Sequence, residues 1–112
     1  MSCEISYSRD FLHDLKRLRK KYRSMDDDLA NFLDDLQKDP LQGTNIGRNL
    51  RKVRMAISSK GKGKSGGARV ITHVIIEVED TAVKLLTIYD KADKENLSEG
   101  ELNRLLKRNN LL

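Results

Sequence analysis

The alternation of hydrophobic and polar residues divides the chain into segments of two different periods. Residues 3–7 alternate with a period of two, which predicts a short strand. Apolar residues then recur twice at helical spacing. We therefore expect one helix from about Arg9 to Arg23 and a second that begins at Ser24 and is stopped by Pro40. A tight connection makes these two helices antiparallel neighbours.

The period of two returns after a glycine-containing connector, residues 41–49. Leu50–Ile57 and Ala68–Val78 each alternate and predict two strands with one apolar face apiece. The third strand in this region, Val83–Lys91, is largely apolar on both faces. Such a pattern is typical of an interior strand that is covered on both sides.

A last apolar stripe follows a capping box, in which Ser98 precedes Glu101 by three residues, and it predicts a C-terminal helix. The expected order is one strand, two helices, three strands and one helix. We interpret residues 1–112 as a single α+β domain. Its small, mostly antiparallel sheet carries two N-terminal helices and one C-terminal helix.

Composition limits where the protein works. The chain has 112 residues, and no apolar run approaches the roughly 20 residues that span a bilayer. The N-terminus lacks the apolar core of a signal peptide, and the single cysteine, Cys3, has no partner for an intramolecular disulfide. We expect a cytoplasmic protein without a membrane partner, in which Cys3 is a half-buried strand residue.

Positive charge is concentrated in one stretch of the chain. Between Pro40 and Ile76 there is no Asp or Glu, but there are eight Lys or Arg residues. These are Arg48, Arg51, Lys52, Arg54, Lys60, Lys62, Lys64 and Arg69. The stretch carries +8 whereas the whole chain carries +5, which leaves −3 for the rest. Charge localised in this way favours binding to a polyanion such as a nucleic acid.

The centre of the basic stretch is a lysine-glycine loop, residues 58–67, which joins two predicted strands. Gly63-Lys64-Ser65 is reminiscent of a P-loop, but that motif needs glycine at position 58 and a helix after the serine. Position 58 is Ser58, and a strand follows, so the P-loop is excluded. We expect a basic hairpin loop instead.

If the two strands beside this loop pair with their apolar faces inward, Lys52, Arg54 and Arg69 share the outward face. This arrangement predicts a concave basic patch next to the loop. RNA cleavage without a metal needs a base for the 2′-OH proton, cations at the phosphate, and an acid for the leaving 5′-oxygen. The basic region has no compact His/Asp/Glu cluster, so we expect neither a metal nor a cofactor.

The cations of the patch can be given roles in such a reaction. We expect Arg69 and Arg54 to stabilise the phosphate, because a guanidinium can bind it bidentately. Lys52 or Lys64 could act as base or acid, because clustered like charges lower a lysine pKa. His73 lies on the Arg69 face and is a candidate for proton transfer, although a strand histidine is more often packed or exposed.

Three segments, residues 51–55, 60–71 and 85–91, resemble the RelE/ParE superfamily of toxins, closest to HigB/RelE-type mRNA interferases of type II toxin–antitoxin modules. The lysine-glycine loop that runs into Gly-Gly-Ala-Arg, with Leu-Leu-Thr-Ile-Tyr-Asp-Lys downstream, carries the resemblance. It implies a ribosome-dependent endoribonuclease that cuts mRNA in the ribosomal A site. It also implies a cognate antitoxin that holds the toxin inactive.

The resemblance places Lys52 and Arg54 on the basic strand positions that line the family's site, and Arg69 on the arginine of the following strand. Two positions depart from RelE. Ala92 replaces an arginine, and no tyrosine occurs near Leu97. The residues that could substitute are Tyr89, Lys91 and Lys94. The candidate catalytic residues are Lys52, Arg54, Lys64, Arg69, Tyr89 and Lys91. The candidate RNA-binding residues are Arg51, Lys60, Lys62, His73 and Lys94.

Two other functions fit the same resemblance. The first is a ParE-like inhibitor of gyrase, which has the same fold and a protein target. ParE-type chains generally lack the lysine-glycine loop, so the loop favours the nuclease. The second is a catalytically degenerate toxin homologue that binds nucleic acid without cleaving it, in keeping with the two departures from RelE.

Overall fold

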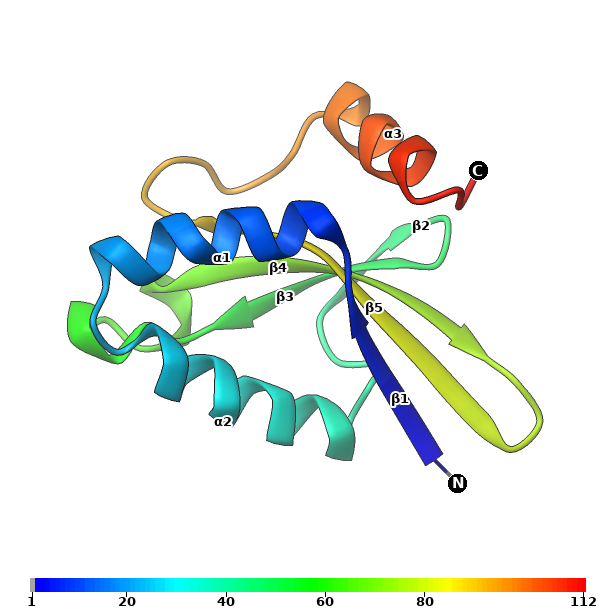
Figure 1. Cartoon of the computed structure of the whole chain (residues 1–112), viewed down its shortest axis with the longest axis horizontal. Helices are drawn as coiled ribbons and strands as arrows, with labels where there is room; N and C mark the ends of the chain where they lie inside the picture. Colours follow the sequence, from blue (N-terminus) through cyan, green and yellow to red (C-terminus); the bar gives the residue numbers. More distant parts are fainter. Residues whose placement is uncertain (1) are drawn as a thin grey trace.

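The computed structural model describes residues 2–112, in which three α-helices pack on one five-stranded sheet (Figure 1). The strands are β1 (Ser2–Tyr7), β2 (Thr44–Gly47), β3 (Leu50–Met55), β4 (Ala68–Ile76) and β5 (Asp80–Asp90). The helices are α1 (Arg9–Lys21), α2 (Met25–Lys38) and α3 (Glu99–Arg108). The strand order is β1-β5-β4-β3-β2, and β1 and β5 are the one parallel pair among these strands. The predicted α+β fold with a mostly antiparallel sheet is confirmed.

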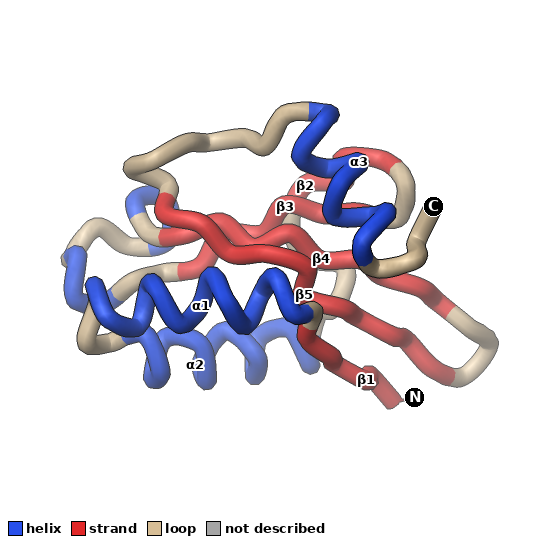
Figure 2. Tube along the Cα trace, turned by 45° about the horizontal axis from the view of Figure 1, so that its top comes forward, coloured by secondary structure: helices blue, strands red, loops and turns tan. Residues whose placement is uncertain are grey.

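The two N-terminal helices cover one face of the sheet, and α3 lies on the other face (Figure 2). The Ser8 hydroxyl accepts a hydrogen bond from the backbone N–H of Phe11 at 2.9 Å, as expected of an N-cap, and so starts α1. Phe11 and Leu15 from α1 then join Phe32 and Leu36 from α2 in the larger core. Burial of these apolar side chains against the sheet is the main force that holds the layer in place.

The second core lies under α3 and depends on a bulge in β5. Ile71 is opposite Thr87 whereas Thr72 is opposite Leu85, so Leu86 is an extra residue in β5. Because of this bulge, Leu85 belongs to the core under α1 and α2 while Leu86 belongs to the core under α3. The prediction that this strand is interior and covered on both sides is confirmed.

The predicted connector 41–49 was wrong in part, because Thr44–Gly47 forms the edge strand β2. The turn from β2 to β3 is made by Arg48 and Asn49, whose φ angles are 54° and 62°. Two successive left-handed residues are the requirement of a type I′ hairpin turn, in which the second is usually glycine. Because neither Arg48 nor Asn49 is glycine, the sequence did not indicate a hairpin turn at these two positions.

Strand limits also differ from the predictions by a few residues. β3 ends at Met55 because the chain enters a short 3₁₀ turn, Ser58–Lys60, after the buried Ile57. β4 ends at Ile76, and Val78 is 99% exposed in the turn to β5. Cys3 is half-buried on β1, as predicted. No helix within residues 2–112 is long and apolar enough to cross a membrane.

Candidate functional site

A small cavity of about 250 Å³ lies beside β3 and is lined by cationic side chains of two elements. Lys52 and Arg54 alternate onto the same face of β3, and Lys64 reaches the cavity from the hairpin loop. The wall opposite them is formed by residues 42–44 and by Glu95, from the segment between β5 and α3. Three cations and one carboxylate thus surround a space next to the sheet.

Gly43 allows the wall of residues 42–44 to approach β3. Its φ is 96°, and a Cβ at this position would lie 2.6 Å from the carbonyl oxygen of Lys52. A side chain would therefore push the wall away and widen the cavity.

Arg69 lies on the expected face but not at the surface. It is directly opposite Arg54 in the β3–β4 pair, which places both on the face that also carries Lys52. Arg69 is nevertheless only 1% exposed, so the prediction that it forms part of an open basic patch is wrong. The reason is that segment 91–98 folds back over the sheet and supplies a carboxylate to the guanidinium, as a buried charge requires.

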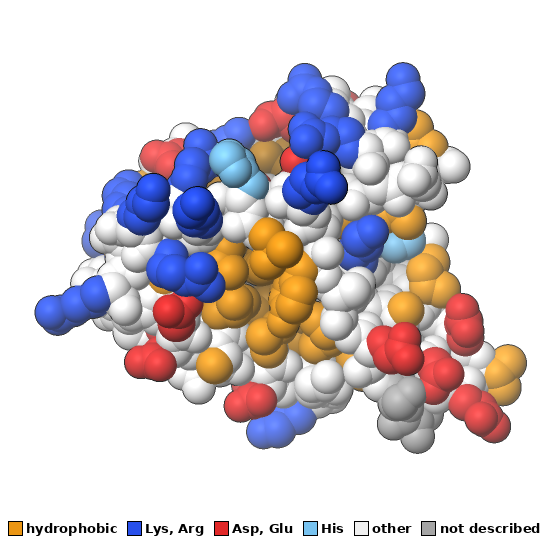
Figure 3. Space-filling view, in the orientation of Figure 1, with side chains coloured by type: hydrophobic (Ala, Val, Ile, Leu, Met, Phe, Trp, Pro, Cys, Tyr) orange, Lys and Arg blue, Asp and Glu red, His pale blue; other side chains and the backbone are white. Residues whose placement is uncertain are grey.

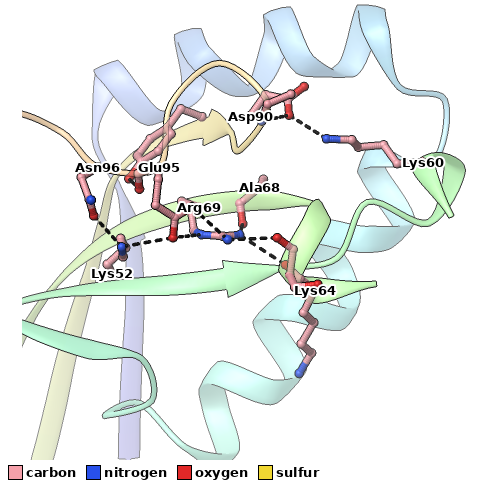
Figure 4. Close-up of polar contacts among 11 residues, drawn as sticks. Lys52, Lys60, Lys64, Ala68, Arg69, Asp90, Glu95 and Asn96 are labelled. Carbon is pink, nitrogen blue, oxygen red and sulfur yellow. Dashed lines mark hydrogen bonds and ion pairs between the residues drawn. The ribbon is translucent and has the colours of Figure 1, made fainter. Parts of the chain in front are cut away.

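The guanidinium of Arg69 has partners at all three nitrogens (Figure 4). Nε donates to Glu95 Oε1 at 3.3 Å, and Nη2 is 3.1 Å from Glu95 Oε2. Nη1 and Nη2 also donate to the backbone carbonyls of Lys64, Ala68 and Ser65 at 3.0–3.3 Å. Arg69 therefore holds both Glu95 and the part of the lysine-glycine loop around Lys64 and Ser65.

Glu95 is the residue that the sequence reasoning missed. Its carboxylate lies between Arg69 and Lys52, whose Nζ is 3.4 Å from Oε1. Burial raises the pKa of Glu95, but the hydrogen bonds and charges of Arg69 and Lys52 outweigh it and lower the pKa below its ordinary value. The carboxylate is therefore ionised at neutral pH. No sequence signal distinguished Glu95, since it is one of several charged residues in an irregular segment.

The start of the lysine-glycine loop, Ser58–Lys60, is anchored by two buried carboxylates. Asp28 of α2 accepts hydrogen bonds from the backbone N–H of Ser58 at 2.9 Å and from its hydroxyl at 2.5 Å. Asp90, at the end of β5, accepts from Lys60 Nζ at 2.8 Å (Figure 4). The side chain of Lys60 is only 11% exposed, so it serves Asp90 and does not line the cavity. Lys62 is exposed at the tip, and no side-chain partner is found for it in the described part of the chain.

Comparison with protein families now identifies the chain. The model of the family described as "RelE toxin of RelE / RelB toxin-antitoxin system" matches residues 11–111. The chain belongs to the RelE toxin family. It is a toxin of a toxin–antitoxin system, and membership implies a cognate antitoxin as partner. The matched range includes every residue of the cavity described above.

Tyr89 of this RelE-family toxin holds segment 91–98 and does not line the cavity. Its hydroxyl donates to the backbone carbonyl of Glu95 at 3.0 Å. Burial, reinforced by the charge of Glu95, raises the pKa of Tyr89 to about 12. The phenol therefore stays neutral and acts as a hydrogen-bond donor to the segment that covers Arg69.

The other candidate residues lie outside the cavity of the toxin. Arg51 Nη1 donates to the carbonyl of Leu41 at 2.7 Å, Lys94 pairs with Glu101 at 2.8 Å, and Lys91 is exposed after β5. His73 is buried, and it lies four residues from Arg69, roughly 13 Å along the strand at about 3.3 Å per residue.

Burial and the charge of Lys84 lower the pKa of His73. His73 lies opposite Leu50, two residues along β3 from Lys52, but it does not line the cavity. The structure thus brings together Lys52, Arg54 and Lys64, with Arg69 behind Glu95, and leaves His73 outside the cavity.

A larger cleft of about 480 Å³ lies between α1 and α3, but its charges balance. Five acidic residues line it, namely Asp10, Asp14, Asp90, Asp93 and Glu101, and five basic ones, namely Arg17, Lys21, Lys94, Arg104 and Arg108. A phosphate would gain little net attraction there, so of these two the smaller cavity is the better candidate for binding an anion. Figure 3 shows Lys and Arg side chains along α1 and acidic side chains around the β4–β5 turn. Within residues 2–112, no three His, Cys, Asp or Glu side chains gather as metal ligands.

Proposed function

We propose that this RelE-family toxin is a metal-independent endoribonuclease that cleaves mRNA and thereby inhibits translation. The observation that carries the proposal is the cavity beside β3, where three cations surround a space next to one ionised carboxylate. The side chain of Arg54 is exposed there and makes no hydrogen bond or ion pair within residues 2–112. It is therefore free to bind a phosphate.

The chemistry suits RNA because the substrate supplies its own nucleophile. The 2′-OH attacks the neighbouring phosphorus, and negative charge builds up on the phosphate oxygens in the transition state. Cations at this point stabilise that charge, and removal of one such donor typically costs about 10²–10³ in rate. We expect Arg54 and Lys64 to contact the phosphate, because both are exposed and line the cavity.

We further propose that cleavage depends on the ribosome. The residues that line the cavity in the described structure include no aromatic side chain on which a base could stack. The site can hold a phosphodiester, but it offers little to fix the bases or select a strand. An mRNA held in the ribosomal A site arrives already oriented, so the toxin needs to supply only the catalytic groups.

The test is cleavage of mRNA on programmed ribosomes, read by primer extension. We expect cuts with the wild-type toxin and a rate about 10²–10³-fold lower with Arg54→Ala, because one phosphate donor is lost. Lys16→Ala is the matched control, since it removes one exposed cation from α1, outside the cavity. Arg69→Ala is a poorer choice, because it leaves Glu95 without its main partner.

If the wild-type toxin leaves the mRNA intact, the proposal is wrong. Inhibition of DNA supercoiling by gyrase would then be assayed for the ParE-like alternative. Equal rates for wild type and Arg54→Ala would keep the nuclease but would remove this cavity as its site.

A further inference from the structure

The cavity lacks an assigned proton acceptor. Arg54 remains protonated at any physiological pH. Lys52 is occupied by other groups, because its Nζ donates to Asn96 Oδ1 at 2.6 Å and lies 3.4 Å from Glu95. Lys64 is 63% exposed, and its nearest acid, Asp35, is 3.9 Å away. Among the residues that line this cavity, only Glu95 is an anion that can accept a proton.

We propose that Glu95 is the general base of the cleavage reaction and that Arg69 is a positioning residue that holds it, an inference that rests on the proposed function. Arg69 contacts the carboxylate from the interior of the protein, with its own side chain 2% exposed, whereas Glu95 is 41% exposed. The side chain that bears the base is therefore open to a ligand, and the side chain that orients it is not.

The contacts of the two carboxylate oxygens decide which one is available. Oε2 is buried, lies 3.1 Å from Arg69 Nη2 and accepts no hydrogen bond from residues 2–112. Oε1 receives only long contacts, 3.3 Å from Arg69 Nε and 3.4 Å from Lys52 Nζ. A carboxylate has about four acceptor sites, two on each oxygen, so the 2′-OH of a substrate reaches Oε1 by displacing the longer of these two contacts, that of Lys52.

The reaction balances with groups of the cavity. Glu95 Oε1 takes the proton of the 2′-OH, and the 2′-oxygen forms a bond to phosphorus. The bond from phosphorus to the 5′-oxygen breaks, its electron pair remains on that oxygen, and the Lys64 ammonium donates a proton to it. The products are a 2′,3′-cyclic phosphate and a free 5′-hydroxyl. Glu95 then returns its proton to water, and Lys64 regains one.

A different role for Glu95 makes the opposite prediction. A carboxylate between Arg69 and Lys52 could instead occupy the place of the substrate phosphate and inhibit the toxin. Removal of its charge would then strengthen RNA binding and accelerate cleavage. If Glu95 is the base, the same change abolishes proton abstraction and slows cleavage. The sign of the effect separates the two.

The experiment compares wild type, Glu95→Gln and the control Asp93→Asn in single-turnover cleavage on programmed ribosomes. Asp93 lies in the same segment, is exposed and carries the same charge, and it does not line the cavity. We expect the cleavage rate of Glu95→Gln to fall by about 10²–10⁴-fold, the usual contribution of a general base, with no loss of affinity for the ribosome. The control should cleave at the wild-type rate.

Thermal unfolding shows whether each variant is folded, and Glu95→Ala provides a second test of the base. Added formate should restore part of its cleavage rate and should restore none in Arg54→Ala. A wild-type or higher rate in folded Glu95→Gln would overturn the role of Glu95 alone, as would absence of rescue by formate in folded Glu95→Ala. Absence of cleavage by the wild type would overturn the proposed nuclease and this role together.

Discussion

Replacement of Asp90 by asparagine removes a buried charge that joins three parts of the toxin. The Asp90 side chain is fully buried, and it accepts hydrogen bonds from Lys60 at 2.8 Å, from the backbone N–H of Ala92 at 2.9 Å and from the hydroxyl of Tyr22. Lys21 Nζ lies 3.4 Å away. The carboxylate thus ties the end of α1 and the lysine-glycine loop to the end of β5. Asparagine keeps the shape but leaves Lys60 without a counter-charge.

The loss in free energy of unfolding follows from the burial of the ion pair between Asp90 and Lys60. Removal of one partner of a buried ion pair costs about 3–5 kcal/mol. We expect about 3 kcal/mol for Asp90→Asn, at the low end of that range, because Lys60 is on a loop and can turn into solvent. With an unfolding entropy of about 2.1 cal/mol/K per residue, a 112-residue chain loses about 13 °C in Tm.

The assay is thermal unfolding at pH 7 of Asp90→Asn, Lys60→Met and the double variant. If the two side chains form one unit, the double variant loses less than the sum of the two single losses, by about 1.5 kcal/mol or more. Asp93→Asn, which removes an exposed charge three residues away, should change Tm little. A shift below about 4 °C for Asp90→Asn, or additive losses in the double variant, would refute the reasoning.

The stability of the folded protein at low pH should also depend on the Asp90 carboxylate. Burial raises the pKa of Asp90, but hydrogen bonds from Lys60, Tyr22 and Ala92 outweigh it and hold the pKa well below its ordinary value. The unfolded chain protonates this carboxyl near pH 3.9, whereas the folded protein keeps it ionised at lower pH. Its contribution is therefore present above about pH 4 and is lost as the pH falls further. The wild type should lose stability more steeply there than Asp90→Asn.

Three further predictions concern the loop and segment 91–98. Gly67→Ala should destabilise the protein by about 1–3 kcal/mol in urea unfolding, because a Cβ would lie 2.1 Å from the carbonyl oxygen of Met55. Lys62→Ala should make the dependence of log affinity for single-stranded RNA on log salt less steep, by about 0.7 in the magnitude of the slope. An unchanged slope would mean that Lys62 contacts no phosphate. In a spectrophotometric pH titration, one tyrosine should ionise with a pKa of about 12, and this late phase should be absent in Tyr89→Phe.

Local signals in the sequence predicted the helices and most strands. Ser8 and Ser98 cap helices through contacts three residues away, and the capping box of α3 is present with both reciprocal hydrogen bonds. Residues that contact each other within one turn leave a pattern that can be read directly. The alternation of β3 and β4 likewise placed Lys52, Arg54 and Arg69 on one face, which the strand register confirms.

The sequence could not show what covers that face. Segment 91–98 has no hydrophobic period, so nothing in it indicated that Glu95 would lie on Arg69. Alternation assigns a strand residue to a side of the sheet, but exposure depends on contacts that are distant in the chain. The burial of Lys60 against Asp90, 30 residues away, could not be predicted from the sequence for the same reason.

The parallel pairing of β1 with β5 has a consequence for the order of folding. Residues 2–7 pair with residues 80–85, and the Ser8 hydroxyl that caps α1 also donates to the carbonyl of Leu86 at 2.7 Å. Contacts across such a separation form late, because the chain must first close a long loop. During synthesis, α1 and α2 emerge before the strands on which they pack. Activity should therefore appear only after β5 leaves the ribosome, which gives the cell a short interval in which the nascent toxin is harmless.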